Sequence, residues 1–372
     1  MNKRCLAVLL ALILAVGAAG CAADPGESGG STVPTGDATA STTTPTTEPL
    51  TTLPTTTEET LPLPDTGDID NQFDAVTRIG DTAYEHYYFA ASNADGYAEM
   101  LATAAQKLNG IATLYDLLVP LSSAVTLPEG VEIEGSDQNQ ALDYLYNQIM
   151  TTAAAKGTSV QWIEALSPLK AHSREYLYFR TDHHWTALGA YYAYQQFALL
   201  KGFTPHALSD YEKREFPGFL GTFYADTGKN PKMAANPDTV AAYVPIADTS
   251  MYFIDQNGVN TPWQVITDVS DWAASSKYNT FIGGDNPFTE ITNNDLHDGS
   301  ACVVVKESFG NAFVPFLVDH YEKVYVIDYR YYKEKSLDQV VKDTGATDVI
   351  FVNAINAAGG GRLSLMEDLV NR

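Results

Sequence analysis

Residues 301–311 read Ala-Cys-Val-Val-Val-Lys-Glu-Ser-Phe-Gly-Asn, an apolar strand that runs into polar residues and the start of a helix. Two more short apolar segments follow at 323–328 and 348–352, and helical patterns lie between or after the three at about 309–321, 337–344 and 363–371. Short strands that are apolar throughout and alternate with helices are typical of a parallel sheet covered on both faces. We therefore predict an α/β domain of three layers, α/β/α.

The residues upstream of this stretch show the same alternation. It predicts strands at 83–90, 111–119, 160–163 and 175–179, and helices at about 95–108, 138–156 and 187–201, the last capped by Thr186 and closed by Gly202. Residues from 203 to about 280 are irregular and rich in Gly, Pro, Asn and aromatic residues. A bare loop of that length is uncommon, so we expect an insertion or a small β-rich subdomain within a domain that spans 71–372.

The first 70 residues lack the pattern of a folded domain. A basic start and an apolar run from Leu6 to Val16 are typical of a signal for export, and Ala18, Ala19 and Gly20 lead to Cys21 as in the lipobox of bacterial lipoproteins. We expect a lipoprotein signal peptide at 1–20 and lipidation of Cys21, with an ordinary signal peptide as the alternative. Residues 21–70 are rich in Thr and Pro and predict a disordered tether. The mature protein is thus expected to be extracytoplasmic and lipid-anchored to the bacterial cell membrane.

Net charge limits the partners that the protein can bind, and cysteine content limits how the fold can be stabilised. The formal net charge of −24 disfavours nucleic acid and acidic membrane faces as partners. Beyond the N-terminal segment the only cysteine is Cys302, within an apolar strand pattern. A single thiol forms no internal disulfide, so the fold must depend on its core.

Two separate runs hold residues that suit acyl transfer. Asp182 and His184 are two apart in a loop before a helix, so they project to one side, with His183 facing away. Ser308 follows an apolar strand, where its hydroxyl is exposed at the sheet edge and the amides of Phe309 and Gly310 are free to donate to an oxyanion. A serine needs a base to remove its proton and a third group to orient that base. The predicted catalytic residues are therefore Ser308 as nucleophile, His184 as base and Asp182 as its orienting partner.

Each of these residues also has a simpler interpretation. Asp182, His183 and His184 could be metal ligands, although adjacent residues rarely bind one ion and only His172 lies nearby. Ser308 could be a helix-capping serine, a common role after a strand. Taken together, the three residues favour the catalytic interpretation, and we predict neither a metal nor a cofactor.

The run from Tyr178 to Tyr194, which contains Asp182-His183-His184-Trp185, closely resembles the signature of the bacterial DHHW protein family. Further stretches that resemble this family are 219–222, 283–287, 308–317 and 326–332. That family is similar to the SGNH hydrolase-like domains of alginate and other cell-envelope O-acetylation proteins, in which an Asp-x-His motif precedes the serine in a circularly permuted order. The resemblance implies an SGNH-hydrolase-like fold, and it places Asp182 and His184 on the motif and Ser308 on the nucleophile. One departure is Glu307-Ser308-Phe309, where Asp-Ser-Tyr is expected.

The resemblance also implies where the oxyanion donors lie. In SGNH enzymes the strand after the serine strand supplies a glycine and the third strand an asparagine. Counting strands places Asn353 at the asparagine position, with a turn residue as the alternative. No glycine ends the second strand, so its donor is missing or is replaced by Arg330, and Asn311 and Asn356 are weaker candidates. The expected oxyanion donors are thus Phe309 and Asn353.

Two functions are expected. In the first, the chain moves or removes an acyl group, most simply acetyl, on a cell-envelope glycan, as an esterase or a transferase and with a membrane protein as a potential acyl-donor partner. In the second, it is a non-catalytic envelope protein that binds glycan or assembles with a partner. Aromatic residues of the insertion suit the stacking of sugars in that case, namely Phe216, Phe219, Phe223, Tyr224, Trp263, Trp272 and Tyr278.

Overall fold

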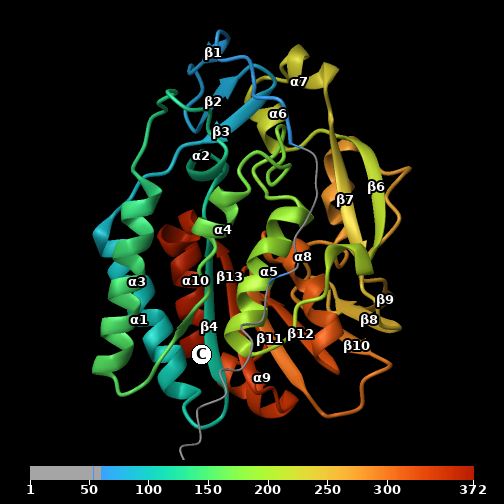
Figure 1. Cartoon of the computed structure of the whole chain (residues 1–372). Coiled ribbons are helices and arrows are strands. Elements are labelled where there is room, and N and C mark those ends of the chain that lie inside the picture. Colours follow the sequence, from blue (N-terminus) through green and yellow to red (C-terminus); the bar gives the residue numbers. More distant parts are fainter. Residues whose placement is uncertain (1–52, 54–59) are drawn as a thin grey trace, which may run out of the picture. The chain divides into compact units, whose positions relative to one another are not determined.

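A computed structural model describes residue 53 and residues 60–372, all within one compact unit that spans Leu50–Arg372 (Figure 1). The expected signal peptide, the lipidation residue Cys21 and most of the expected tether lie outside the described residues. The described part begins before Asn71. The Leu61 amide donates to the Arg174 carbonyl at 2.7 Å, and strand β1 is Ile69–Asp70. The boundary expected at Asn71 therefore falls inside the packed region.

A central sheet of eight strands organises the fold, in the order β5-β4-β13-β11-β12-β10-β8-β9. Five neighbouring strands run parallel, as the sequence predicts: β5 (Gln161–Trp162), β4 (Thr113–Val119), β13 (Asp348–Ala354), β11 (Ala301–Lys306) and β12 (Lys323–Asp328). Burial along β4, β11 and β13 is nearly continuous, because helices cover both faces of the sheet there. The α/β fold class is confirmed.

The sheet is mixed, however, and not parallel throughout. Strand β10 (Phe288–Asn293), β8 (Thr249–Ile254) and β9 (Asn260–Trp263) extend it beyond β12, each antiparallel to its neighbour. Buried and half-buried residues alternate along β10, a pattern typical of an antiparallel strand near a sheet edge. Two of these strands lie in the segment expected to be an insertion, so that segment completes the sheet and does not form a separate body.

The helices form two groups, one on each face of the sheet (Figure 1). In one group, α1 (Ala91–Lys107) contacts α3 (Gln138–Ala155), α9 (Leu337–Thr344) and α10 (Gly360–Asn371). In the other, α5 (Ala187–Lys201) contacts α4 (Leu166–Ala171) and α8 (Gly310–Phe313). Helix α5 has the predicted bounds: Thr186 Oγ1 accepts from the Gly189 amide at 3.3 Å, and Gly202 ends the helix at φ 83°.

Smaller elements surround this core. Strands β1, β2 (Val76–Ile79) and β3 (Thr82–Glu85) form an antiparallel sheet that precedes α1 and replaces the single strand expected at 83–90. No strand forms at 175–179, where the described backbone makes one bridge, from Tyr178 to Trp185. Between α5 and β8 lie a two-stranded sheet, β6 (Glu212–Phe219) and β7 (Asp238–Val244), and two short helices, α6 (Thr222–Asp226) and α7 (Pro231–Ala235). A further short helix, α2 (Ser122–Val125), precedes α3.

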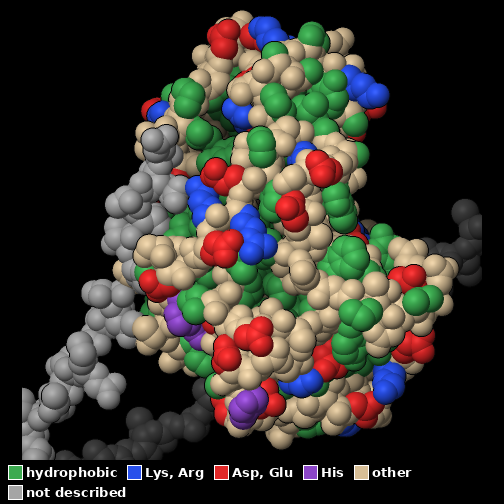
Figure 2. Space-filling model, turned by 90° about the vertical axis from the view of Figure 1, so that its right-hand side faces the viewer, with side chains coloured by type: hydrophobic (Ala, Val, Ile, Leu, Met, Phe, Trp, Pro, Cys, Tyr) green, Lys and Arg blue, Asp and Glu red, His purple; other side chains and the backbone are tan. Residues whose placement is uncertain are grey.

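The surface and the interior agree with the composition. On the face shown in Figure 2, basic and acidic side chains are interspersed among apolar and uncharged ones. Cys302 is a free thiol in β11 with no exposed surface, as the apolar pattern predicts. Among the helices within the described ranges, none has both the length and the apolar character needed to cross a membrane.

Candidate active site

Three side chains from two segments that are distant in sequence meet above the carboxyl ends of β11 and β13. His184 Nδ1 lies 2.6 Å from Asp182 Oδ1, and His184 Nε2 lies 2.7 Å from Ser308 Oγ. Asp182 and His184 come from the loop before α5, and Ser308 lies in the turn between β11 and α8. All three are buried, yet Ser308 keeps 8% and His184 7% of their surface exposed. The structure therefore brings together the three residues that the sequence singled out.

The hydrogen bonds decide which nitrogen of His184 is free to act as a base. An ionised carboxylate only accepts hydrogen bonds, so the short contact with Asp182 places the proton on Nδ1. In the neutral imidazole Nε2 is then an acceptor, and it faces the Ser308 hydroxyl. This is the tautomer that can take a proton from a serine as that serine attacks a carbonyl carbon.

Asp182 is held in place by the segment that follows β6. The Thr222 amide donates to Asp182 Oδ2 at 2.9 Å, and the His184 amide donates to Oδ1 at 3.0 Å. Burial alone would raise the pKa of Asp182, but the charge and hydrogen bond of His184 outweigh it, so the pKa lies below its usual value. Asp182 is therefore ionised at neutral pH. Gly221 packs so closely on Asp182 that a methyl group there would overlap the carboxylate.

His183 does not turn away from the site, contrary to what the spacing predicts, because its ring lies against the His184 imidazole, with centroids 3.8 Å apart, and near the Phe309 ring. Its Nδ1 lies 2.7 Å from Thr222 Oγ1, and burial together with repulsion from His184 lowers its pKa to about 3. Asp182, His183 and His184 each offer one ligand atom within 4.8 Å of the others, so these three side chains lie close enough together to bind one metal ion. However, both ring nitrogens of His184 already face Asp182 and Ser308. The arrangement suits proton transfer better than metal binding.

Tyr278 supports both His184 and the serine turn, and sequence reasoning gave it no role in the site. Its ring is stacked on the His184 imidazole, with centroids 4.0 Å apart and planes 12° apart, and its hydroxyl donates to the Ser308 carbonyl at 3.0 Å. Trp185, which follows His184, donates from Nε1 to the Phe309 carbonyl at 2.9 Å. The Asp182–His184 loop and the serine turn are therefore joined by contacts beyond those among Asp182, His184 and Ser308.

The amides after Ser308 are not free, contrary to the prediction. The Gly310 amide donates to the Glu307 carbonyl at 2.9 Å, and the Phe309 amide donates to Glu307 Oε1 over a long 3.4 Å. The same carboxylate accepts from the Ala354 amide at 3.0 Å and from Ser308 Oγ at 3.2 Å. Glu307 therefore folds back over the turn and competes with His184 for the serine proton.

The other oxyanion donors expected from strand counting, Asn353 and Arg330, are buried or paired with other residues. Asn353 has no exposed surface, and its amide contacts Met366 Sδ at 3.6 Å, so a substrate cannot reach it in this conformation. The reason is that β13 continues through Ala354, which leaves Asn353 inside the strand with its side chain toward α10. Arg330 pairs with Asp328 at 2.7 Å and with Asp285 at 2.9 Å and is likewise occupied.

A buried ion-pair network lies beneath the serine turn. Lys306 has 1% of its side chain exposed and pairs with Asp285 at 2.9 Å and with Asp328 at 3.0 Å. Asn311, from α8, donates to the same Asp285 oxygen as Lys306, at 2.9 Å. Burial raises the pKa of Asp285, but the charges of Lys306 and Arg330 outweigh this effect and hold the pKa below its usual value. The network ties the ends of β11 and β12 to the loop before β10.

Accessible polar groups near the triad come from β3 and from the segment after β13. Asn356 Nδ2 donates to Glu85 Oε1 at 2.8 Å, and Arg362 Nη1 donates to Asn356 Oδ1 at 3.1 Å. Burial raises the pKa of Glu85, whose carboxylate also interacts with the charge of His184. All three side chains are half-buried. Sequence analysis ranked Asn356 below Asn353, and no periodic or motif signal marks Glu85 or Arg362.

Comparisons with known proteins agree with this fold. A structure of a DHHW family protein from Eubacterium siraeum is 29% identical, with a TM-score of 0.72, over 83% of this chain and 99% of that one. Bacillus cereus PatB1, in a structure with a sulfonyl adduct, is similar at 20% identity and a TM-score of 0.65, over 78% of this chain and 98% of that one. No protein with curated annotation matches the sequence. The sequence model described as DHHW protein matches residues 58–327, and the chain therefore belongs to the DHHW family.

Proposed function

We propose that this protein is a lipid-anchored, extracytoplasmic serine enzyme that transfers or hydrolyses an acyl group, most simply acetyl, on a cell-envelope polysaccharide. The observation that carries the proposal is the continuous set of contacts from Asp182 through His184 to Ser308, at 2.6 and 2.7 Å. A partly exposed serine, a base in the right tautomer and an ionised partner are what a nucleophilic acyl transfer requires.

The reaction proceeds in two half-reactions. Ser308 Oγ attacks the carbonyl carbon of the ester while His184 Nε2 takes the hydroxyl proton, and Asp182 stabilises the imidazolium that forms. The leaving alcohol takes that proton from Nε2 as its bond to the acyl carbon breaks, which leaves an acyl-Ser308 ester. Water or a sugar hydroxyl then gives its proton to His184 and attacks, and the proton returns to Ser308 as the acyl group leaves.

The developing oxyanion needs donors that the resting arrangement only partly supplies. The Phe309 amide is one, because its 3.4 Å bond to Glu307 is long enough to be exchanged for a stronger one to the oxyanion. Asn356 and Arg362 are half-buried donors on the side of Glu85, and we propose that they meet the substrate. Buried Asn353 is not part of this proposal.

Hydrolysis of 4-nitrophenyl acetate tests the proposal directly. We expect Ser308→Ala to lower kcat by about a thousandfold or more, since loss of the nucleophile removes the covalent route. Ser275→Ala changes an exposed serine without a described side-chain hydrogen bond and is the matched control. Folding is checked by circular dichroism and thermal unfolding. Unchanged turnover in a folded Ser308→Ala protein would refute the proposal.

A sulfonyl fluoride gives a second, independent readout. PatB1 has been solved with a sulfonyl adduct, and its likeness to this chain is one of fold. We expect phenylmethylsulfonyl fluoride to form one sulfonyl ester on Ser308 with loss of fluoride, detected by peptide mass spectrometry and absent in Ser308→Ala. Activity that persists in excess EDTA is expected as well, whereas loss on chelation and recovery with an added divalent ion would favour the metal alternative.

The second candidate function is a non-catalytic glycan-binding or assembly protein. Most of the aromatic residues that suited it in the sequence are core residues: Phe216, Phe219, Phe223 and Tyr278 are buried, and Trp272, at 37%, is the most exposed of the set. The insertion therefore offers little aromatic surface for sugars. Glycan retention without any esterase activity would favour this function.

The anchor is tested separately from the chemistry. We propose that Cys21 carries the lipid that holds the enzyme at the membrane, within reach of an acyl-donor partner. Cys21→Ala is expected to move the protein from the membrane fraction to the medium and to abolish labelling by a fatty-acid analogue. Membrane retention of the variant would contradict the anchor and leave the triad proposal unaffected.

A further inference from the structure

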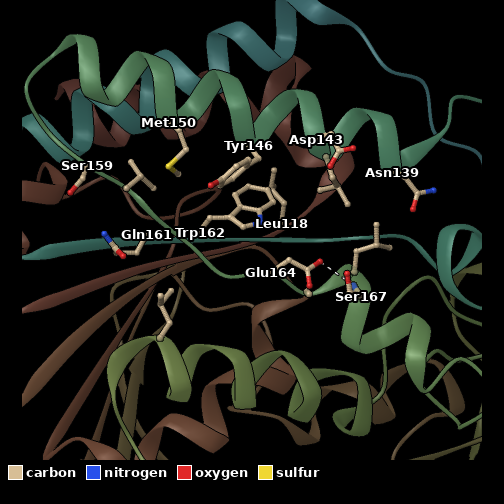
Figure 3. A pocket seen from close by; sticks show the side chains of 15 residues that line it. Leu118, Asn139, Asp143, Tyr146, Met150, Ser159, Gln161, Trp162, Glu164 and Ser167 are labelled. Carbon is tan, nitrogen blue, oxygen red and sulfur yellow. Dashed lines mark hydrogen bonds between the residues drawn. The ribbon is translucent and has the colours of Figure 1, made fainter. Parts of the chain in front are cut away.

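A second surface feature lies away from the triad, in a groove between α3 and the edge strand β5. Its volume is about 770 Å³, within the range of roughly 300 to 1,000 Å³ that small-molecule sites occupy. Figure 3 shows side chains from α3 directed toward β5 and the turn that leads to α4. Neither Ser308 nor its partners line the groove.

The sequence of α3 gives the helix two distinct faces. Ala141, Leu145 and Ile149 are buried on the side that packs within the domain, and Leu142, which is also buried, lines the groove. The groove face carries Asn139, Asp143, Tyr146 and Met150, spaced by four, three and four residues, so they lie along one stripe of the helix (Figure 3). A stripe that mixes an aromatic ring with polar groups is not needed for solubility or for the core. It therefore suits a ligand.

Two aromatic rings form the centre of the groove. Tyr146 and Trp162 meet edge to face, with ring centroids 5.7 Å apart and planes 65° apart. Tyr146 is 43% exposed and Trp162 is half-buried. Within residues 60–372, neither the Tyr146 hydroxyl nor the Trp162 indole N–H has a described hydrogen-bond partner, and the same holds for the side chains of Asp143 and Gln161. Apolar ring surface is thus presented beside several unused polar groups.

The charge of the groove restricts the ligand further. Its lining contains the carboxylates of Asp143 and Glu164 and no lysine or arginine. An anionic polymer would be repelled, while a lipid or an apolar helix would bury unpaired carboxylate and amide groups at a cost. A neutral sugar fits both features, because its C–H face packs on aromatic rings and its hydroxyls donate to carboxylate and amide oxygens.

We propose that this groove binds a segment of a neutral polysaccharide. The identity of that polysaccharide as the acylated substrate rests on the proposed function, but binding itself does not. The groove would hold the polysaccharide beside the edge strand β5, and the triad would act on it at the carboxyl ends of β11 and β13. This supplies a reason for a large polymer to remain on the enzyme between acyl transfers.

Tetrasaccharide binding tests the proposal in the folded, full-length protein. We expect isothermal titration calorimetry to show saturable binding of chitotetraose or cellotetraose, and anionic tetragalacturonate to bind about tenfold more weakly or worse. Tyr146→Ala removes an exposed ring and is expected to weaken binding about tenfold, Trp162→Ala at least as much, and Trp162→Phe less than Trp162→Ala. Tyr88→Ala, at an exposed tyrosine outside the groove, is the matched control and should bind as the unchanged protein does.

The outcomes separate this proposal from the one for the triad. If neither neutral tetrasaccharide binds, or if binding survives folded Tyr146→Ala and Trp162→Ala proteins, the groove proposal is wrong. Preferential binding of tetragalacturonate would also overturn it. The hydrolysis of 4-nitrophenyl acetate involves no sugar, and tetrasaccharide binding involves no ester, so either proposal can fail while the other stands.

Discussion

The phenol ring of Tyr278 lies parallel to the imidazole of His184, with centroids 4.0 Å apart and planes 12° apart. Its hydroxyl reaches past that ring to the Ser308 carbonyl, at 3.0 Å. One side chain from the irregular segment before β10 thus touches both the proposed base and the backbone of the proposed nucleophile. Its effect on catalysis should be separable into a stacking part and a hydrogen-bonding part.

Tyr278→Phe keeps the stacked ring and loses the bond to Ser308, so we expect kcat/KM to fall by less than about tenfold, the scale of one neutral hydrogen bond. Tyr278→Ala frees the imidazole and leaves a cavity, and we expect a loss of about a hundredfold together with a destabilisation of about 3–5 kcal/mol. Kinetics on 4-nitrophenyl acetate and urea unfolding measure the two effects. Equal kinetics for both variants would show that stacking does not orient His184.

Gly221→Ala tests the close approach of the backbone to Asp182. Any side chain at 221 would overlap the Asp182 carboxylate, so the variant should displace it from His184 and from the Thr222 amide. Loss of the orienting carboxylate costs on the order of 10⁴ in kcat in a related triad, and a displaced one should cost at least about tenfold. Gly361→Ala meets no neighbouring atom and is the control. Full activity in a folded Gly221→Ala protein would contradict the role of this contact.

Lys306→Met removes the central cation of the network below the serine turn. Asp285 and Asp328 would keep only Arg330 as a cationic partner, and breaking a buried ion pair of this kind costs about 3–5 kcal/mol. Lys342→Ala breaks the exposed pair with Asp338 on α9, which should cost only about 0.3–0.5 kcal/mol. Urea unfolding of both proteins compares the two. A small effect at Lys306 would mean that the network sets geometry without adding stability.

Asp116 predicts a pH-dependent stability. It is fully buried in β4, where the Tyr97 hydroxyl donates to one oxygen at 2.7 Å and the other oxygen has no partner. Burial raises its pKa to about 7, above the value of about 3.9 expected in the unfolded chain. The folded protein therefore holds the proton more tightly, and the contribution of this group to stability falls as the pH rises from 4 to 7.

Asp116→Asn removes that titration. The variant should unfold at a higher temperature than the unchanged protein at pH 8, and the difference should shrink as the pH is lowered toward 4. Thermal unfolding at several pH values measures this, with Asp143→Asn, at an exposed position on α3, as the control. A constant difference across the range would show that Asp116 does not titrate as proposed.

Local signals account for the parts of the fold that the sequence predicted well. Thr186 and Gly202 fix the ends of α5 through bonds to neighbouring backbone, so the helix bounds follow from residues within it. The apolar character of β11 and β13 reflects burial on both faces, which places their carboxyl ends, and hence Ser308, at one edge of the sheet. Convergence of the triad follows from that topology.

The features that were missed depend on distant contacts. Tyr278 and Thr222 reach the site from an irregular segment without periodicity, and only the folded chain shows where they lie. Asn353 was misplaced because β13 extends to Ala354, and strand ends are the least certain part of a pattern. Strands such as β10 are short and alternate in burial, which makes them hard to distinguish from loops.

Strand β13 is the last strand of the chain, yet it lies between β4 and β11 in the middle of the sheet. During translation the β4 segment emerges from the ribosome more than two hundred residues before its partner, since Thr113 pairs with Asp348. Until residues 348–354 are made, β4 and β11 each present an open edge that other chains can join. A prematurely terminated product that lacks only this final portion would therefore be prone to aggregate. It would also lack the Ala354 amide that binds Glu307 beside Ser308, so its serine turn would not take the native shape.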